Sequence, residues 1–239
     1  MSSSRRIAFV TGVLFLITFI TAIPALLLFD PVLNEADYII GAGADNRVRL
    51  GAFLELLLII ANIGTALVLF PLLKRQNETV ALGFVAARIM ECVFIAAGIL
   101  SVLSIVTLRQ DFAGAGGAES ASLLVTGEAL VAIKDWTFWL GPGFVVGIGN
   151  GLLLGYLMYR SGLVPRPLAM LGLIGGPLIC ASGIAIVFDV FEAGSVWQGI
   201  ATIPEFLWEL SLGIYLTMKG FTPSPIASAY DRDVGHEAG

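Results

Sequence analysis

Residues 49–73 read RLGAFLELLLIIANIGTALVLFPLL, and this stretch decides the class of protein. Crossing roughly 30 Å of hydrocarbon takes about 20 predominantly apolar residues in a helix, and this run is long enough. It nevertheless contains Glu55 and Asn62, which are seven residues apart and therefore share one helix face. A charge at the bilayer centre costs about 2.5–3.5 kcal/mol, so such residues usually face the protein interior. The stretch predicts a membrane-spanning helix with one polar face.

The rest of the chain repeats this composition. Of the 239 residues, 57% are hydrophobic and 13% are charged, whereas a soluble domain has about 45–50% apolar and about 25% charged residues. Further runs of spanning length cover residues 7–28, 80–107, 136–159, 167–188 and 200–219. The first run exceeds the apolar region of a signal peptide, about 7–15 residues, so we expect it to be retained. We predict an all-α, six-helix transmembrane bundle that forms a single domain over residues 1–221, with a disordered cytoplasmic tail over 222–239.

Basic residues are distributed unevenly between the two sides of this bundle. One side carries eight of them: Arg5, Arg6, Lys74, Arg75, Arg160, Arg166, Lys219 and Arg232. The other side carries four: Arg47, Arg49, Arg109 and Lys134. The positive-inside rule therefore places both termini in the cytoplasm. The lipid bilayer is the expected partner, and no basic face indicates binding to nucleic acid.

The longest connection, residues 108–135, falls on the outer side. It contains a glycine-rich hinge, Ala113-Gly114-Ala115-Gly116-Gly117, followed by apolar residues at helical spacing from Leu123 to Val131. This pattern favours a short amphipathic helix on the outer interface over an irregular loop.

Five ionisable side chains lie within predicted spans: Glu55, Arg88, Glu91, Glu205 and Glu209. Arg88 and Glu91 are three residues apart, a spacing at which helix side chains meet. At about 1.5 Å per residue, Glu91 and Glu209 reach similar depths near mid-membrane, where Arg88 can bridge them. Four acids against one base (1 − 4) give a net charge of −3 if all are ionised. Some of this acid must therefore be protonated, hydrated or neutralised by another group.

Two interpretations of this polar cluster stay open. It can be a structural network that fixes helix register, because buried glutamates with a pKa of about 8–9 are known and need no counter-charge at neutral pH. It can also be a site for a proton or for a cationic or polar small-molecule ligand, formed by Glu55, Asn62, Arg88, Glu91, Glu205 and Glu209. Intramembrane ionisable residues are functional candidates by default.

The fourth predicted span carries glycines at a strict spacing of four residues: Gly143, Gly147, Gly151 and Gly155. The fifth offers a matching strip in Gly172 and Gly176. Small residues let helix backbones approach closely in a bilayer, where no hydrophobic force drives association. We expect this strip either to pack the fourth span on the fifth or to form the face of a homo-oligomer.

Several kinds of chemistry are excluded by residue type. No histidine lies in any predicted span, which removes Ser-His proteolysis, histidine-based zinc hydrolysis and bis-His haem binding. No pair of aspartates is embedded, and no phosphate-binding loop is present. We therefore expect no cofactor, no metal and no catalytic residue, and a glutamate-based intramembrane enzyme is the third and last hypothesis for the activity.

Three runs together resemble a known family: residues 134–143 (KDWTFWLGPG), residues 159–166 (YRSGLVPR) and residues 203–210 (IPEFLWEL). With Arg88-Ile89-Met90-Glu91, they make the chain similar to a bacterial membrane family catalogued as domain of unknown function 4386. The family usually shows His where this chain has Lys134. It has no agreed activity, so the resemblance implies a multi-pass protein of the bacterial cell (inner) membrane and no mechanism. It also implies that Glu91, Glu205 and Glu209 lie in recurrent motifs.

The leading functional hypothesis is therefore a small carrier or ligand-binding membrane protein with the glutamate and arginine cluster as its polar site. The alternative is a structural or regulatory membrane subunit whose charges only stabilise the bundle.

Overall fold

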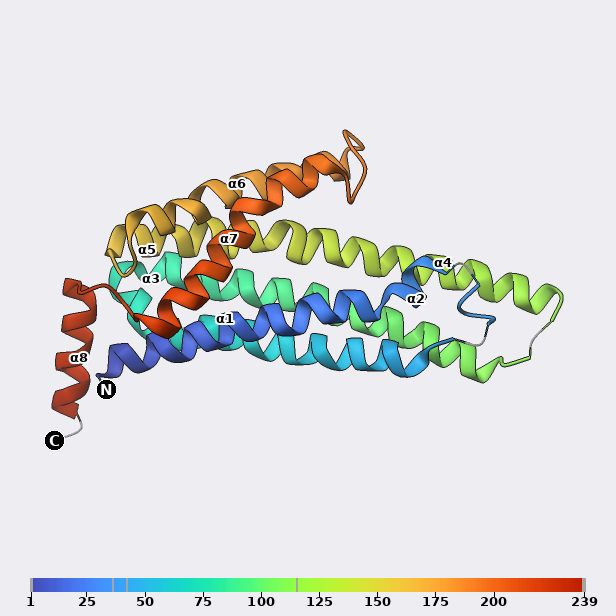
Figure 1. Ribbon diagram of the computed structural model, residues 1–239, viewed down its shortest axis with the longest axis horizontal. Helices are drawn as coiled ribbons and strands as arrows, with labels where there is room; N and C mark the ends of the chain where they lie inside the picture. The colour runs from blue at the N-terminus through green and yellow to red at the C-terminus, as the bar shows by residue number, and fades with distance from the viewer. Residues whose placement is uncertain (1, 36, 42, 115, 238–239) are drawn as a thin grey trace.

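A computed structural model describes residues 2–35, 37–41, 43–114 and 116–237. Ala115 of the predicted hinge and residues 238–239 of the predicted tail lie outside the described residues. Every regular element in the described ranges is a helix (Figure 1). Four segments are long and apolar enough to cross a membrane: Ser3–Leu28, Asp45–Asp111, Ala118–Ser161 and Arg166–Val187. The all-α class is confirmed, and the four segments indicate a membrane-embedded protein.

The first helix, α1 (Ser3–Leu28), contains threonines whose hydroxyls bond to its own backbone. Thr18 donates to the Phe15 carbonyl at 2.7 Å, and Thr21 donates to the Ile17 carbonyl at 2.8 Å. Such bonds allow hydroxyl side chains to lie in an apolar helix without unmet polar groups. The short helix α2 (Asp30–Asn34) follows, with Pro31 in its first turn, where the missing N–H of proline is not needed.

The longest helix, α3 (Asp45–Asp111), is bent back on itself at Asn77, whose φ of −162° and ψ of 108° are not helical. The Asn77 side chain accepts a hydrogen bond at 3.1 Å from the backbone N–H of Val80, so it caps the second arm of α3. Figure 1 shows the two arms, cyan and green, lying side by side and running in opposite directions. The bend falls between the predicted second and third spans.

A second long rod consists of α4 (Ala118–Leu140), the π-helices η1 (Gly141–Val145) and η2 (Gly147–Leu154), and α5 (Gly155–Ser161). The segment predicted as an amphipathic helix is helical, but the prediction that this helix is short and separate is wrong: it forms the first part of α4 and continues without a break. The physical reason is that residues 118–140 contain no proline, and that Lys134 points into the protein, where it is buried. At about 1.5 Å per residue these 44 residues span roughly 60 Å, about twice the hydrocarbon thickness.

Two further helices, α6 (Arg166–Val187) and α7 (Val196–Met218), form a hairpin whose connecting end leans away from the other rods, near the middle of their length (Figure 1). At the end that holds the termini, α7 lies against α1. Helix α7 carries Gln198, Glu205 and Glu209 and is not among the four segments above.

The sequence predicts a disordered tail from residue 222, but residues 225–237 form a helix, α8 (Pro225–Glu237). It lies across the ends of the rods near the N-terminus (Figure 1). Asp231 accepts hydrogen bonds from the backbone N–H and the hydroxyl of Ser4, both at 2.7 Å, and Asp233 pairs with Arg75 at 2.6 Å. These long-range partners, which composition cannot show, explain why the segment is ordered.

The apolar core is divided in two. One cluster lies at the end with both termini and includes Phe15, Leu69, Phe84 and Trp208. The other lies toward the opposite end and includes Phe29, Val48, Ile99 and Val102. The order along α3 shows what separates them: the first arm passes from Val48 through the polar pair Glu55 and Asn62 to Leu69. A polar layer therefore crosses the middle of the protein.

Candidate functional site

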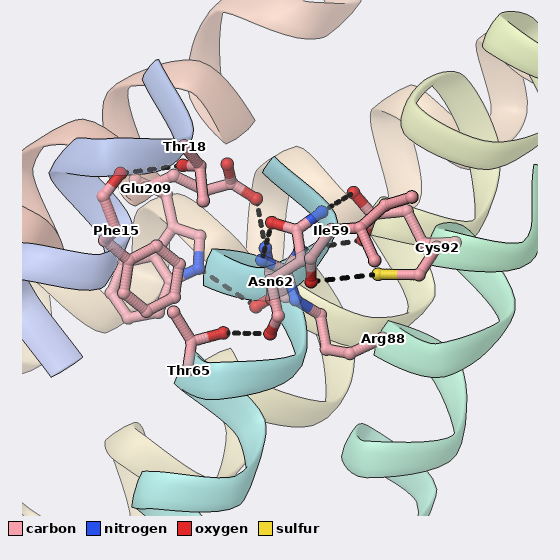
Figure 2. A network of polar contacts seen from close by, with 11 residues as sticks. Phe15, Thr18, Ile59, Asn62, Thr65, Arg88, Cys92 and Glu209 are labelled. Atoms are coloured by element: carbon pink, nitrogen blue, oxygen red, sulfur yellow. Dashed lines mark hydrogen bonds and ion pairs between the residues drawn. The ribbon is translucent and has the colours of Figure 1, made fainter. Parts of the chain in front are cut away.

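Three side chains in this layer form a closed ring of hydrogen bonds (Figure 2). Arg88 and Glu91 come from the second arm of α3, three residues apart, and Asn62 comes from the first arm. Arg88 donates from Nη1 to Glu91 at 2.7 Å and from Nη2 to the Asn62 Oδ1 at 2.6 Å. Asn62 closes the ring by donating to the other Glu91 oxygen at 3.2 Å. The ring joins the two arms of α3 at mid-length.

The ring is buried, so the loss of one of its members should destabilise the protein. Arg88 is only 2% exposed, and Phe15 of α1 covers its guanidinium with a ring centroid 5.9 Å away. Removing one partner of a buried ion pair destabilises a protein by about 3–5 kcal/mol, because the other charge is left uncompensated. The predicted contact between Arg88 and Glu91 is present, but the second partner of the Arg88 guanidinium among the described residues is Asn62 and not Glu209.

A second buried ion pair joins α3 to α4. Lys134 Nζ lies 2.7 and 2.8 Å from the two carboxylate oxygens of Glu55. Both residues are buried, with exposed fractions of 5% for Lys134 and 8% for Glu55, and the ammonium lies 4.6 Å from the Phe29 ring centroid. The sequence places Lys134 in an outer loop, so its role in the core was missed. The signal that could have revealed it was the excess of glutamates over basic residues in the predicted spans, which calls for a further basic side chain that points into the protein.

With Lys134 included, the polar layer holds four glutamates and two bases. The net charge is then −2 if all six are ionised (2 − 4), compared with −3 from the residues in the predicted spans. Two bases are already bound to glutamates, so two acids have no basic partner among the described residues. These are Glu205 and Glu209 of α7.

The π-helical part of the α4–α5 rod supplies a hydrogen-bond partner for Glu209. Asn150 of η2 donates a hydrogen bond from its side-chain amide to Glu209, and its backbone carbonyl accepts one from the Trp208 indole at 2.9 Å. A π-helix bonds i to i+5 and displaces carbonyls from the regular ladder, and it occurs often at functional sites. The glycine-rich sequence around Asn150 allows this geometry, but periodicity does not reveal it.

The glycine strip of this rod faces α6. A Cβ atom added to Gly147 would lie 2.7 Å from the Gly176 carbonyl oxygen, and one added to Gly151 would lie 2.8 Å from the Gly176 nitrogen. Gly155 approaches the backbone at Leu173, and Gly172 faces the Trp208 ring. Of the two expectations for the strip, packing on the fifth predicted span is the contact present within the chain. A further member, Gly143, lies near Gly183.

Glu205 differs from the members of the closed ring in its lack of hydrogen-bond partners among the described residues. It is 2% exposed, and neither carboxylate oxygen has a hydrogen-bond partner among the described residues. One oxygen lies 2.7 Å from the position of a Cβ added to Gly151 and 2.8 Å from that of a Cβ added to Gly175. The two glycines therefore provide the space that the carboxylate fills.

All six side chains predicted as site candidates line one cavity of about 350 Å³. Its wall comes from α1, both arms of α3, α4, α6 and α7. Lys134 and Asp135 also line it, and the remaining wall is mainly apolar and aromatic. A second cavity of about 380 Å³ shares Phe138, Trp139 and Thr202 with the first and reaches Gly194 in the connection between α6 and α7.

Fold and cavity together define a class: a helical membrane protein with a buried polar layer that opens into an internal cavity. The chain belongs to the family described as a domain of unknown function (DUF4386), whose model matches residues 10–220. The resemblance drawn from the three sequence runs is thus confirmed. No curated protein and no solved structure matches the chain.

Proposed function

We propose that this protein is a small, non-enzymatic carrier or ligand-binding protein of the membrane, and that its ligand occupies the cavity beside the polar layer. The observation that carries the proposal is the cavity of about 350 Å³ that all six candidate side chains line. Binding sites for small molecules are typically about 300–1,000 Å³, mostly apolar, and hold a few convergent polar groups. The ligand is therefore a small amphipathic molecule.

The proposal includes a six-span topology in the bacterial cell (inner) membrane with both termini in the cytoplasm. The spans are α1, the two arms of α3, the rod from α4 to α5, α6 and α7. Support comes from Figure 1, in which both termini lie at the same end of the rods, as an even number of spans requires. The eight basic residues that favour a cytoplasmic location include Arg5, which caps the end of α7 by donating to the Leu216 carbonyl at 3.0 Å.

A structural or regulatory subunit is the second candidate, and one observation favours it. The Asn62–Arg88–Glu91 ring and the Glu55–Lys134 pair bind their charges internally and need no ligand. Under this alternative the cavity is a packing defect. The two candidate functions therefore make different predictions: the cavity of a ligand-binding protein binds a small amphipathic molecule that fits it, and the cavity of a structural subunit does not.

Binding of matched probes distinguishes them. Isothermal titration calorimetry on protein in lipid nanodiscs, with empty nanodiscs as the blank, is carried out with 2-phenylethylamine, 2-phenylethanol and 3-phenylpropanoate. These share an aromatic body and differ in charge. We expect at least one to bind with one-to-one stoichiometry, because the cavity combines an apolar wall with a polar end.

The matched variants are Thr202→Trp, which fills the region shared by both cavities, and Ile200→Trp, an equal change at a 54% exposed position on the same helix. Thr202→Trp should weaken probe binding at least about tenfold, whereas Ile200→Trp should leave it unchanged. If no probe binds, or if Thr202→Trp binds every probe as the wild type does, the structural subunit is the better account.

A further inference from the structure

We infer that the ligand is an amphipathic organic cation with an N–H donor, and that Glu205 is the group that receives it; this inference rests on the proposed function. Its basis is the combination of an unpartnered buried carboxylate, an excess of acid around the cavity, and aromatic rings beside that carboxylate.

The carboxylate of Glu205 is the clearest sign of a missing donor. It is buried, it lines the cavity, and neither oxygen accepts a hydrogen bond from the described residues. The other glutamates of the layer differ: Glu55 accepts from Lys134, Glu91 from Arg88 and Glu209 from Asn150. A buried acceptor without a donor is unfavourable, so the position is suited to a ligand that brings its own N–H groups.

The charges that line the cavity favour a cation over an anion. Five acids face it: Glu55, Glu91, Asp135, Glu205 and Glu209. The two bases, Arg88 and Lys134, already donate to glutamates, although the Nε of Arg88 has no partner among the described residues. An ammonium group placed at Glu205 reduces the excess of negative charge, whereas a carboxylate there would increase it.

Aromatic side chains provide the second half of the site. Phe206, adjacent to Glu205 in sequence, meets Phe19 of α1 edge to face with centroids 5.1 Å apart. Phe138 and Trp139 of α4 form another edge-to-face pair at 4.9 Å. All four line the cavity. Ring faces attract ammonium groups and also bury an apolar body, so one ligand can satisfy both the carboxylate and the rings.

The second cavity gives this ligand a route. It contains Phe138, Trp139 and Phe206 in its wall and extends to Gly194 and Ser195, in the connection where α6 and α7 lean away from the other rods. A cation entering there meets aromatic rings before it meets Glu205. The connection between α6 and α7 is therefore the point of access.

The three probes named above test the ligand class directly on the wild-type protein. We expect 2-phenylethylamine, which is an ammonium ion at neutral pH, to bind at least about tenfold more tightly than 2-phenylethanol, as one charge-assisted hydrogen bond allows. We expect 3-phenylpropanoate to bind most weakly. If the neutral or the anionic probe binds best and Thr202→Trp blocks it, the cavity is a binding site but the cation inference is overturned.

The variant Glu205→Gln tests whether the carboxylate of Glu205 is the group that binds the ammonium probe. The change keeps the size of the side chain and should weaken the ammonium probe at least about tenfold while altering the neutral probe less than about twofold. Glu192→Gln, the same change at an exposed position in the connection between α6 and α7, is the control and should alter neither. Equal loss of both probes in Glu205→Gln, or no loss of either, would contradict the assignment. Should Glu205→Gln not fold, the order of the three probes on the wild type still decides the ligand class.

Discussion

Lys134 and Glu55 form an ion pair with both partners buried, in which one ammonium lies 2.7 and 2.8 Å from the two oxygens of the carboxylate. The pair links α4 to the first arm of α3, and both residues line the cavity described above. It turns a residue of the predicted outer loop into part of the protein core. The pair also explains how one of the buried acids is neutralised.

Removal of the Lys134 ammonium should destabilise the protein. We expect Lys134→Met to lower the free energy of unfolding by about 3–5 kcal/mol, because Glu55 is then buried without a counter-charge. The double variant Lys134→Met with Glu55→Met should recover most of that loss, since apolar residues often replace a buried pair without cost. Unfolding in mixed micelles with increasing dodecyl sulfate measures both. Equal stability of the single variant and the wild type would show that the pair contributes nothing.

Arg88 should be equally sensitive. We expect Arg88→Ala to destabilise the protein by several kcal/mol, because Glu91 loses its counter-charge and the Asn62 Oδ1 loses its donor. Arg6→Ala, at an exposed position of α1, is the control and should change the free energy of unfolding by less than about 0.5 kcal/mol. The same micelle titration compares them. An Arg88→Ala protein as stable as Arg6→Ala would exclude a structural role for the ring.

Glu209→Gln should be tolerated, in contrast to Arg88→Ala. The Gln side chain keeps a carbonyl oxygen that accepts the hydrogen bond from Asn150, and among the described residues Glu209 forms no ion pair with a base. We expect a change of less than about 1 kcal/mol in the free energy of unfolding. Asn150→Ala removes the donor instead and should destabilise more than Glu209→Gln does. The reverse order would show that the Glu209 charge itself is needed.

The contact between the fourth and fifth predicted spans depends on glycines, because the two helix backbones approach too closely for a Cβ atom. A Cβ at Gly176 would lie 2.6 Å from the Gly147 carbonyl oxygen and 2.8 Å from the Leu152 nitrogen, so Gly176→Ala forces the rods apart. We expect a loss of about 1–3 kcal/mol, the usual cost of overpacking. Gly199→Ala on α7, where nothing lies within 4 Å, should instead stabilise by about 0.4–1 kcal/mol. Thermal unfolding measures both variants: the midpoint of Gly176→Ala should lie below that of the wild type, and the midpoint of Gly199→Ala should lie above it.

Attachment of α8 should depend on pH. Partial burial tends to raise the pKa of Asp231, but the hydrogen bonds from Ser4 outweigh it and hold the pKa below its usual range. A lowered pKa means that the contact is fully present above the pKa of the unfolded chain, about 3.9, and is lost as the pH falls through the lower value in the folded protein.

Hydrogen exchange of residues 225–237 measures this release. We expect faster exchange in α8 below about pH 3.9, with little change between pH 5 and 8. Asp231→Asn should exchange faster at neutral pH and lose most of its response to acid. Protection that stays constant down to the lowest pH would contradict a role for this carboxylate.

Much of the candidate site was visible in the sequence. Glu55, Asn62, Arg88, Glu91, Glu205 and Glu209 stand out because each interrupts a stretch of apolar residues. The contact between Arg88 and Glu91 follows from their spacing on one helix. Lys134 was missed because charge next to a predicted span is normally solvated, and Asn150 because its role depends on the π-helix around it.

The sequence by itself determined the all-helical, membrane-embedded class, because long apolar runs can satisfy their backbone hydrogen bonds in lipid only as helices or closed barrels, and their length and periodicity here favour helices. It also determined which polar residues need an explanation. Only the tertiary structure decided their partners: the ring at Arg88, the pair at Lys134, the order in α8, and the carboxylate of Glu205 beside an open cavity. The physical reason is that these depend on how helices rotate and shift against one another. Residues as distant as Glu55 and Lys134 meet only after the rods pack.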